Sequence, residues 1–168
     1  MPKVYLIAGC NGAGKTTASL TLLPEMLECK EFVNADNIAA GISPSQPDKV
    51  AFEAGRLMLK RINDLIDMKI DFAIETTLSS RNYISKIKEF QKKDYEVVLI
   101  YFWLNTPILA IERIKERVKK GGHFIPDEIV NRRYYRGINN LLKYFIPLSD
   151  YWLVLIIQVR MQCWLLRV

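Results

Sequence analysis

The stretch Gly9-Cys10-Asn11-Gly12-Ala13-Gly14-Lys15-Thr16 decides the fold of this 168-residue chain. It fits the phosphate-binding pattern G-x-x-x-x-G-K-[ST] at every fixed position. Glycines let backbone N–H groups approach a phosphate closely, and the start of the following helix adds a favourable partial charge. The stretch therefore predicts a nucleotide-binding loop; the alternative is a glycine-rich turn that matches the pattern by chance.

The sequence on either side of the loop supplies the context that the pattern requires. Residues 4–8 form a short apolar run suited to a buried parallel strand. Residues 17–23 can continue as a helix until Pro24. Lys15 is expected to reach the β and γ phosphates of ATP, and the Thr16 hydroxyl to bind Mg²⁺. The expected ATP-binding residues are Gly9, Asn11, Gly12, Ala13, Gly14, Lys15, Thr16 and Thr17.

Length and composition favour one packed domain that spans residues 1–168. Half of the residues are hydrophobic (50%), which is ample for a core in a chain of this size. The three cysteines are an odd number without metal-ligand spacing, which suits a reducing cytoplasm better than a set of disulfides. The first apolar run ends at once in the phosphate loop, so it is not a signal peptide. We expect a cytoplasmic protein with no membrane association.

The positive charge is concentrated in one segment. The formal net charge is +6, and residues 111–136 hold eight basic residues against four acidic ones, a net +4. In a phosphate-handling protein, basic residues gathered in one segment are better explained by the binding of small phosphates than by the binding of a long polynucleotide. Because no stacking platform or recognition motif accompanies the charge, we expect no nucleic-acid partner.

Polar side chains follow two further predicted strands. Residues 31–34 resemble a short strand that leads to Asp36, and residues 71–74 a buried strand that ends in Glu75, Thr76 and Thr77. In open α/β sheets the chemistry gathers outside the carboxyl ends of the strands. At this edge Asp36 can accept the proton of an attacking hydroxyl or hold a metal-bound water. Glu75, Thr76 and Thr77 can bind the acceptor, and Glu75 can instead lie near Mg²⁺. Helix capping is the alternative, by Asp36 for residues 37–40 and by the threonines for residues 82–93.

A helical lid is predicted at about residues 111–136. The clearest buried strand, residues 95–104, leads into a helix that carries Arg117, and residues 119–126 then break the helix with paired glycines. A second helix carries Arg132 and Arg133. Closure of such a lid excludes water, and its arginines stabilise charge on a transferring phosphoryl group. The alternative is two solvated helix faces.

Four blocks together carry a resemblance to a known family. The chain is similar to the zeta-toxin-like branch of P-loop kinases, particularly its small stand-alone predicted ATPases, over residues 3 to about 152. The resemblance implies an α/β P-loop NTPase fold: a doubly wound, mostly parallel five-stranded sheet with helices on both faces and a helical lid. The blocks are Gly12-Ala13-Gly14-Lys15-Thr16-Thr17, Val33-Asn34-Ala35-Asp36, Phe72-Ala73-Ile74-Glu75-Thr76-Thr77-Leu78-Ser79 and Arg117-Val118-Lys119-Lys120-Gly121-Gly122-His123.

The same resemblance implies an activity and roles for single residues. In characterised zeta toxins, Mg-ATP phosphorylates a hydroxyl of UDP-N-acetylglucosamine, so a nucleotide sugar is the expected acceptor and an antitoxin an expected partner. By position, Lys15 corresponds to the ATP lysine, Asp36 to the general base and Glu75 to the substrate-binding acid. The lid arginines correspond to Arg117 and to Arg132 or Arg133. A polynucleotide or RNA kinase, and a non-catalytic ATP-binding partner in a toxin–antitoxin-like system, remain alternatives.

The chain departs from the family pattern at its end. Relatives usually carry Asp-Asn-Ser near the close of the last strand, whereas residues 153–168 form an apolar tail without it. Residues 155–158 can be encoded TTG ATA ATT CAG, which in another frame contains GAT AAT TCA, or Asp-Asn-Ser. We hypothesise that a frameshift after about Val154 replaced the native tail; a genuine final strand followed by an apolar tail is the alternative. As a membrane span the tail is short and is interrupted by Arg160.

Overall fold

The computed structural model describes residues 1–157 and, for the backbone, residues 164–166. Its strands form one sheet in the order β2-β3-β1-β4-β5-β6. The strands are β1 (Lys3–Gly9), β2 (Glu31–Val33), β3 (Phe72–Thr76), β4 (Glu96–Trp103), β5 (Tyr151–Ile156) and β6 (Trp164–Leu166). The first five strands are parallel, which confirms the predicted sheet, and β6 extends its edge by antiparallel pairing with β5.

Helices connect the strands by crossovers, as parallel pairing requires. The α-helices are α1 (Lys15–Thr21), α2 (Ala35–Ile42), α3 (Ala51–Asp67), α4 (Asn82–Lys92), α5 (Pro107–Lys119), α6 (Asp127–Asn140) and α7 (Ile146–Leu148). A π-helical turn, η1 (Leu22–Met26), follows α1, and another, η3 (Leu141–Phe145), joins α6 to α7; a 3₁₀ turn, η2 (Pro47–Val50), precedes α3. The chain thus stays helical through Pro24, where the sequence predicted an end. Among the described helices, none is long and apolar enough to cross a lipid bilayer.

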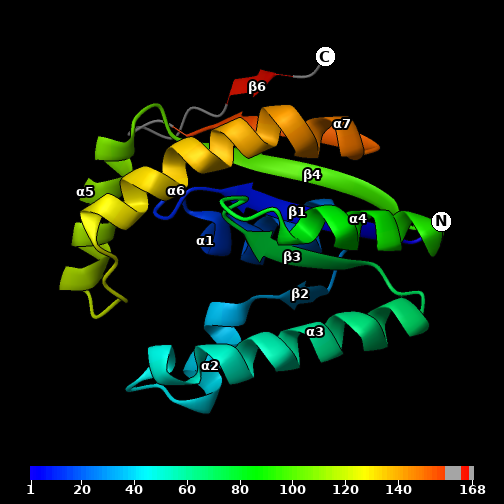
Figure 1. Ribbon diagram of the computed structural model, residues 1–168, viewed down its shortest axis with the longest axis horizontal. Helices are drawn as coiled ribbons and strands as arrows, with labels where there is room; N and C mark the ends of the chain where they lie inside the picture. Colours follow the sequence, from blue (N-terminus) through cyan, green and yellow to red (C-terminus); the bar gives the residue numbers. More distant parts are fainter. Residues whose placement is uncertain (158–163, 167–168) are drawn as a thin grey trace.

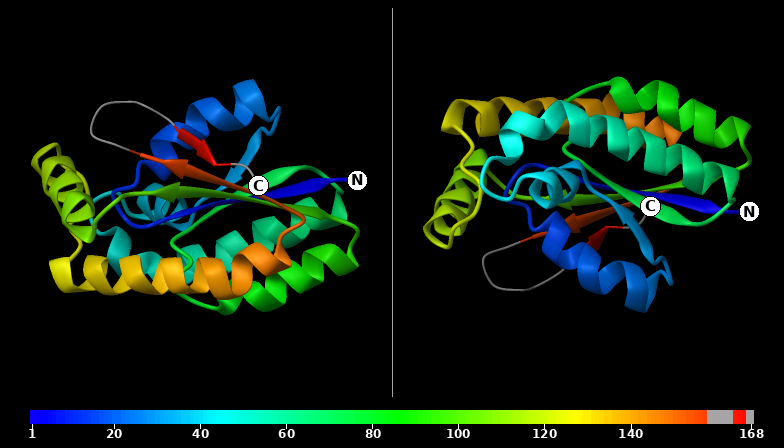
Figure 2. Two further views of the ribbon diagram at one scale, coloured as in Figure 1. Left: turned by 90° about the horizontal axis from the view of Figure 1, so that it is seen from above. Right: turned by 90° about the horizontal axis from the view of Figure 1, so that it is seen from below.

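Helices cover both faces of the sheet (Figures 1 and 2). On one face, Ile62 of α3, Phe90 of α4 and Phe145 of η3 are fully buried in a core with the inward residues of β1, β3 and β4. On the other face, Leu23 of η1 and Ile114 of α5 belong to a second core. The central strand β1 contributes alternate residues to both cores, which explains its unbroken apolar sequence.

The carboxyl ends of the parallel strands meet at one edge of the sheet. Ala8 pairs with Thr76 of β3, and Gly9 pairs with Phe102 of β4. The phosphate loop, the start of α2 and the turn after β3 therefore lie together. The hypothesised replacement of the tail after about Val154 falls partly on residues 158–163 and 167–168, which lie outside the described residues.

Candidate ATP and acceptor site

The phosphate loop runs from the end of β1 to the start of α1. Its glycines at positions 12 and 14 have φ values of 79° and 84°, which L side chains adopt only with strain. A Cβ at Gly12 would also lie 2.7 Å from the carbonyl oxygen of Ala110 in α5. Glycine at both positions therefore lets the loop turn sharply, and Gly12 also lets it pack directly on the α5 backbone.

Lys15 is held inside the loop. Its side chain is 5% exposed, and its ammonium donates a hydrogen bond to the Cys10 carbonyl oxygen at 2.9 Å. Burial lowers the pKa of Lys15, while the charge of Glu75 and, more weakly, that of Asp36 oppose this shift. The same burial raises the pKa of the Cys10 thiol to about 11, so Cys10 remains a protonated, small apolar residue. The site thus has a desolvated cation at the position where the sequence predicts the β and γ phosphates.

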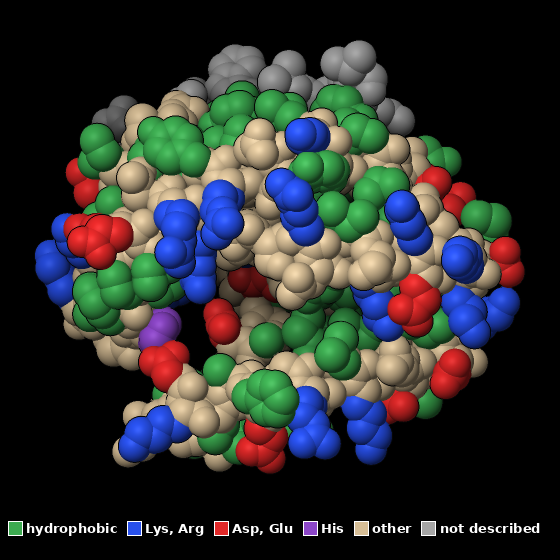
Figure 3. Space-filling view, in the orientation of Figure 1, with side chains coloured by type: hydrophobic (Ala, Val, Ile, Leu, Met, Phe, Trp, Pro, Cys, Tyr) green, Lys and Arg blue, Asp and Glu red, His purple; other side chains and the backbone are tan. Residues whose placement is uncertain are grey.

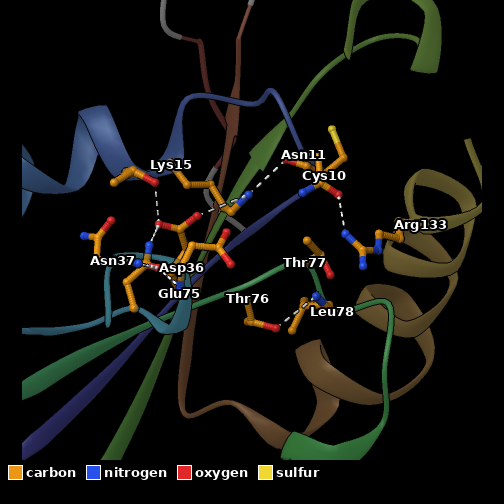
Figure 4. A network of polar contacts seen from close by, with 12 residues as sticks. Cys10, Asn11, Lys15, Asp36, Asn37, Glu75, Thr76, Thr77, Leu78 and Arg133 are labelled. Atoms are coloured by element: carbon orange, nitrogen blue, oxygen red, sulfur yellow. Dashed lines mark hydrogen bonds and ion pairs between the residues drawn. The ribbon is translucent and has the colours of Figure 1, made fainter. Parts of the chain in front are cut away.

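Glu75, at the carboxyl end of β3, lies against the same loop (Figure 4). Its Oε2 accepts hydrogen bonds from the Thr16 hydroxyl at 2.7 Å and from the Asn34 amide at 2.6 Å. Its Oε1 lies 3.6 Å from the Lys15 ammonium. The sequence left open whether Glu75 binds the acceptor or lies near Mg²⁺, and these contacts favour the position near Mg²⁺. A hydroxyl and a carboxylate oxygen are hard ligands of the kind Mg²⁺ prefers, so the residues present fit this ion.

Asn34 joins β2 to α2 and organises this part of the site. Its Oδ1 accepts hydrogen bonds from the backbone N–H groups of Asp36 and Asn37, at 2.8 and 3.1 Å, and so caps α2. Capping by Asp36, one of the two alternatives, is therefore wrong, because Asp36 lies in the first helical turn. The Asp36 side chain is exposed and has no hydrogen-bond partner among the described residues. Sequence reasoning missed the role of Asn34, although an Asn directly after a strand and before a helix is a typical cap signal.

Thr76 and Thr77 shape the turn after β3. The Thr76 hydroxyl accepts a hydrogen bond from the Leu78 N–H at 3.1 Å, and the Thr77 hydroxyl lies 2.8 Å from that of Ser79. The N-cap residue of α4 is Arg81, without a side-chain bond, so the alternative that the threonines cap this helix is wrong. They remain candidates for binding the acceptor, and Figure 4 shows Thr77 on the same side of the loop as Asp36.

The three predicted lid arginines differ in the residues that they contact. Arg133 of α6 reaches the phosphate loop, where its Nη1 donates a hydrogen bond to Asn11 Oδ1 at 3.3 Å (Figure 4). Arg117 of α5 instead donates to the carbonyl oxygen of His123 at 2.9 Å and supports the loop between the two helices. Arg132 is exposed and contacts no described residue by an ion pair or a hydrogen bond.

A hollow opens between the lid helices and the α2–α3 side of the molecule (Figure 3). Lysine and arginine side chains line the lip over α6, and acidic side chains lie within the hollow (Figure 3). The imidazole of His123 lies 3.6 Å from the carboxylate of Asp48 in η2, so the loop between α5 and α6 contacts the connection that precedes α3. A second cavity of about 550 Å³ lies along α5, beside the start of α1; it is lined by Thr17, Leu109, Glu112, Arg113, Glu116, Arg117 and Lys120.

Comparisons with known proteins identify related sequences. The zeta toxin family model matches residues 1–143. An uncharacterized protein of Haemophilus influenzae is 33% identical over 132 residues, which are 79% of this chain and 92% of that protein.

Solved structures share the fold at low sequence identity. A chain of the PezAT chromosomal toxin–antitoxin system of Streptococcus pneumoniae has a TM-score of 0.68 and 17% identity; the match covers 97% of this chain and 70% of that one. A chain of the AvrRxo1-ORF1:-ORF2 complex with ATP has a TM-score of 0.78 and 15% identity, over 99% of this chain and 57% of the other. These two likenesses show the fold.

Proposed function

The chain belongs to the zeta toxin family, and from that premise we propose that it transfers the γ-phosphoryl group of Mg-ATP to a hydroxyl of a small molecule. A nucleotide sugar such as UDP-N-acetylglucosamine is the acceptor class that the family suggests. The observation that carries the proposal is the meeting of Lys15, Thr16 and Glu75 at the carboxyl ends of β1 and β3. It supports a site for a triphosphate and a divalent cation beside an exposed carboxylate, that of Asp36.

In this proposal the loop and Lys15 hold the phosphates. The Lys15 ammonium exchanges its contact with Glu75 for phosphate oxygens, which are stronger charge-assisted acceptors. Thr16 and Glu75 would hold Mg²⁺, which would supply positive charge beside the phosphates. Arg133 is hydrogen-bonded to the phosphate loop, and we assign it the stabilisation of charge on the transferring group.

Asp36 serves as the general base. Its carboxylate takes the proton of the acceptor hydroxyl, the hydroxyl oxygen bonds to the γ-phosphorus, and the bond from that phosphorus to the bridging oxygen breaks to release ADP. Two features support this role: the side chain has no described hydrogen-bond partner, and its charge acts on Lys15. Because Asn34 caps α2, Asp36 is not needed as the cap of the helix.

The proposal is tested by transfer of labelled γ-phosphate from Mg-ATP to UDP-sugars, nucleosides and short RNAs. We expect a labelled UDP-sugar with the parent protein and none with Lys15→Ala or Asp36→Asn. Asp67→Asn, an exposed change at the far end of α3, is the matched control and is expected to keep full transfer. If only RNA were labelled, the acceptor would be a polynucleotide and not a nucleotide sugar. If the protein bound ATP but transferred phosphate to none of these acceptors, it would be a non-catalytic ATP-binding protein and not a kinase.

We also propose a protein partner and a cytoplasmic location. One structural neighbour comes from a chromosomal toxin–antitoxin system, which supports an antitoxin-like partner for this chain. If free activity harms the cell, expression of the parent protein slows growth and Asp36→Asn relieves the effect. Equal growth with the two proteins would argue against a toxic activity.

A further inference from the structure

One face of α6 contacts both halves of the proposed reaction site. Arg133, Gly137 and Asn140 follow one another at helical spacing, so they lie along the same side of the helix. Arg133 contacts the phosphate loop, whereas Gly137 and Asn140 contact the turn after β3, residues 76–79. We propose that Gly137 and Asn140 are positioning residues that set the acceptor-binding turn at a fixed place relative to the phosphate loop. The inference rests on the proposed kinase function.

The turn needs support from outside itself. Leu78 has a φ of 53° and is fully buried, although this left-handed conformation is rare for a bulky residue. Such a conformation persists only where the surrounding structure holds it in place. Within the turn, the hydroxyls of Thr76 and Thr77 bond to the following residues, and these local bonds fix its shape but not its location.

Asn140 supplies the first outside contact. It is 5% exposed, and its Nδ2 donates a hydrogen bond of 2.7 Å to the Leu78 carbonyl oxygen. This bond joins residues that are 62 positions apart, at the point of the turn where the backbone is left-handed. A buried amide with one clear acceptor holds that carbonyl in one direction.

Gly137 supplies the second contact. A Cβ at this position would lie 2.8 Å from the Thr77 carbonyl oxygen and 3.5 Å from the Tyr101 hydroxyl. The α6 backbone therefore lies directly against the backbone of the turn, with no flexible side chain between them. Since Thr77 is a candidate acceptor-binding residue, a shift of α6 would move the acceptor.

The contact of Arg133 with Asn11 extends the same face of α6 to the phosphate loop. One rigid helix contacts the loop that binds the donor and the turn that binds the acceptor, so it fixes the separation between the two. A misplacement of about 1 Å between reacting groups can lower the rate by about 100-fold. Small changes at Gly137 or Asn140 should therefore act on transfer far more than on ATP binding.

Two variants and one matched control test the proposal. Asn140→Asp keeps the size of the side chain but replaces the donor to Leu78 by a carboxylate oxygen, which cannot donate. Gly137→Ala adds a methyl group against Thr77 while it favours the helix itself, so α6 is not weakened. The control, Asn139→Asp, makes the same chemical change at an exposed neighbour on the same helix. For each protein we would measure the Kd for Mg-ATP, kcat and KM with UDP-N-acetylglucosamine, and hydrogen–deuterium exchange of the Leu78 and Ser79 amides.

We expect kcat/KM for the acceptor to fall about 10- to 100-fold in both variants, with a Kd for Mg-ATP within about twofold of the parent protein. Exchange of the two amides should accelerate in the variants and not in the control. Unchanged exchange and unchanged kcat/KM, or a parallel loss of ATP binding, would overturn the inference. If the parent protein phosphorylates no acceptor, the kinase proposal fails, and the exchange rates still decide whether α6 holds the turn.

Discussion

Replacement of Glu75 by glutamine tests the charge arrangement of the site in the absence of any ligand. Thr16 and Asn34 both donate to the same oxygen, Oε2, and a glutamine carbonyl oxygen at that place can accept both bonds. The amide NH₂ then takes the place of Oε1 and faces the Lys15 ammonium, which lies 3.6 Å away in the parent structure. The substitution therefore removes the attraction to Lys15 and leaves both donors with an acceptor.

The magnitude follows from that distance and from burial. Two unit charges 3.6 Å apart attract by about 5 kcal/mol at an effective dielectric constant of about 20. Breaking a buried ion pair from one side costs about 3–5 kcal/mol, and Lys15 is 5% exposed. Because the substituted glutamine would retain both hydrogen bonds, we expect the lower end, a loss of about 3 kcal/mol in the free energy of unfolding at neutral pH.

The pH dependence has a defined sign. Burial lowers the pKa of folded Lys15 below its ordinary value of 10.5, and Glu75 opposes that shift, so the pKa falls further in the variant. Between the folded pKa and 10.5, the unfolded chain binds more protons than the folded one, and stability rises with pH. This pH range is wider in the Glu75→Gln variant, because the pKa of its folded Lys15 is lower. The difference in stability between the two proteins should therefore be largest near pH 7 and shrink as the pH approaches 10.

Urea unfolding without nucleotide, at about pH 7 and about pH 9.5, measures this difference. The matched control is Glu96→Gln, since Glu96 lies 4.0 Å from the Lys3 ammonium in a pair that is partly exposed. The control should lose less than about 1 kcal/mol. A loss from Glu75→Gln that equals that of the control, or one that is the same at both pH values, would refute the buried charge pair.

Three further predictions concern single side chains. Asp36→Asn should lower kcat for phosphoryl transfer by about 10²- to 10⁴-fold while the melting temperature and the Kd for ATP change far less; retained transfer would remove its role as a base. Asn34→Ala should lower the free energy of unfolding by at least about 1–2 kcal/mol, since α2 loses its cap and Glu75 loses a donor, whereas Asn34→Asp can still cap but places a carboxylate against Glu75 and should lose at least as much; a smaller loss for Asn34→Asp in urea unfolding would contradict this. Arg133→Ala should lower kcat at least about tenfold and Arg132→Ala much less, because only the former of the two contacts the phosphate loop; equal effects in steady-state kinetics would contradict this assignment.

Local sequence patterns predicted what depends on short-range structure. The loop, the parallel strands and the location of Asp36 and Glu75 at strand ends follow from the order of apolar runs and polar ends, and the structure has them there. The choice among Arg117, Arg132 and Arg133 could not be predicted, because it depends on how each helix is rotated about its axis and which neighbour it meets. Gly137 was missed for the same reason, since its contact with Thr77 joins segments far apart in the chain.

The central place of β1 has a consequence for synthesis. Its two neighbours in the sheet, β3 and β4, are made much later, so one edge of this apolar strand stays unpaired until residues 72–76 have left the ribosome, and the other until residues 96–103 have done so. At about 5–20 residues per second, the delay lasts several seconds. An unpaired apolar strand of this kind associates readily with other chains. The strand that carries the phosphate loop is therefore the part of the nascent protein that most needs a chaperone.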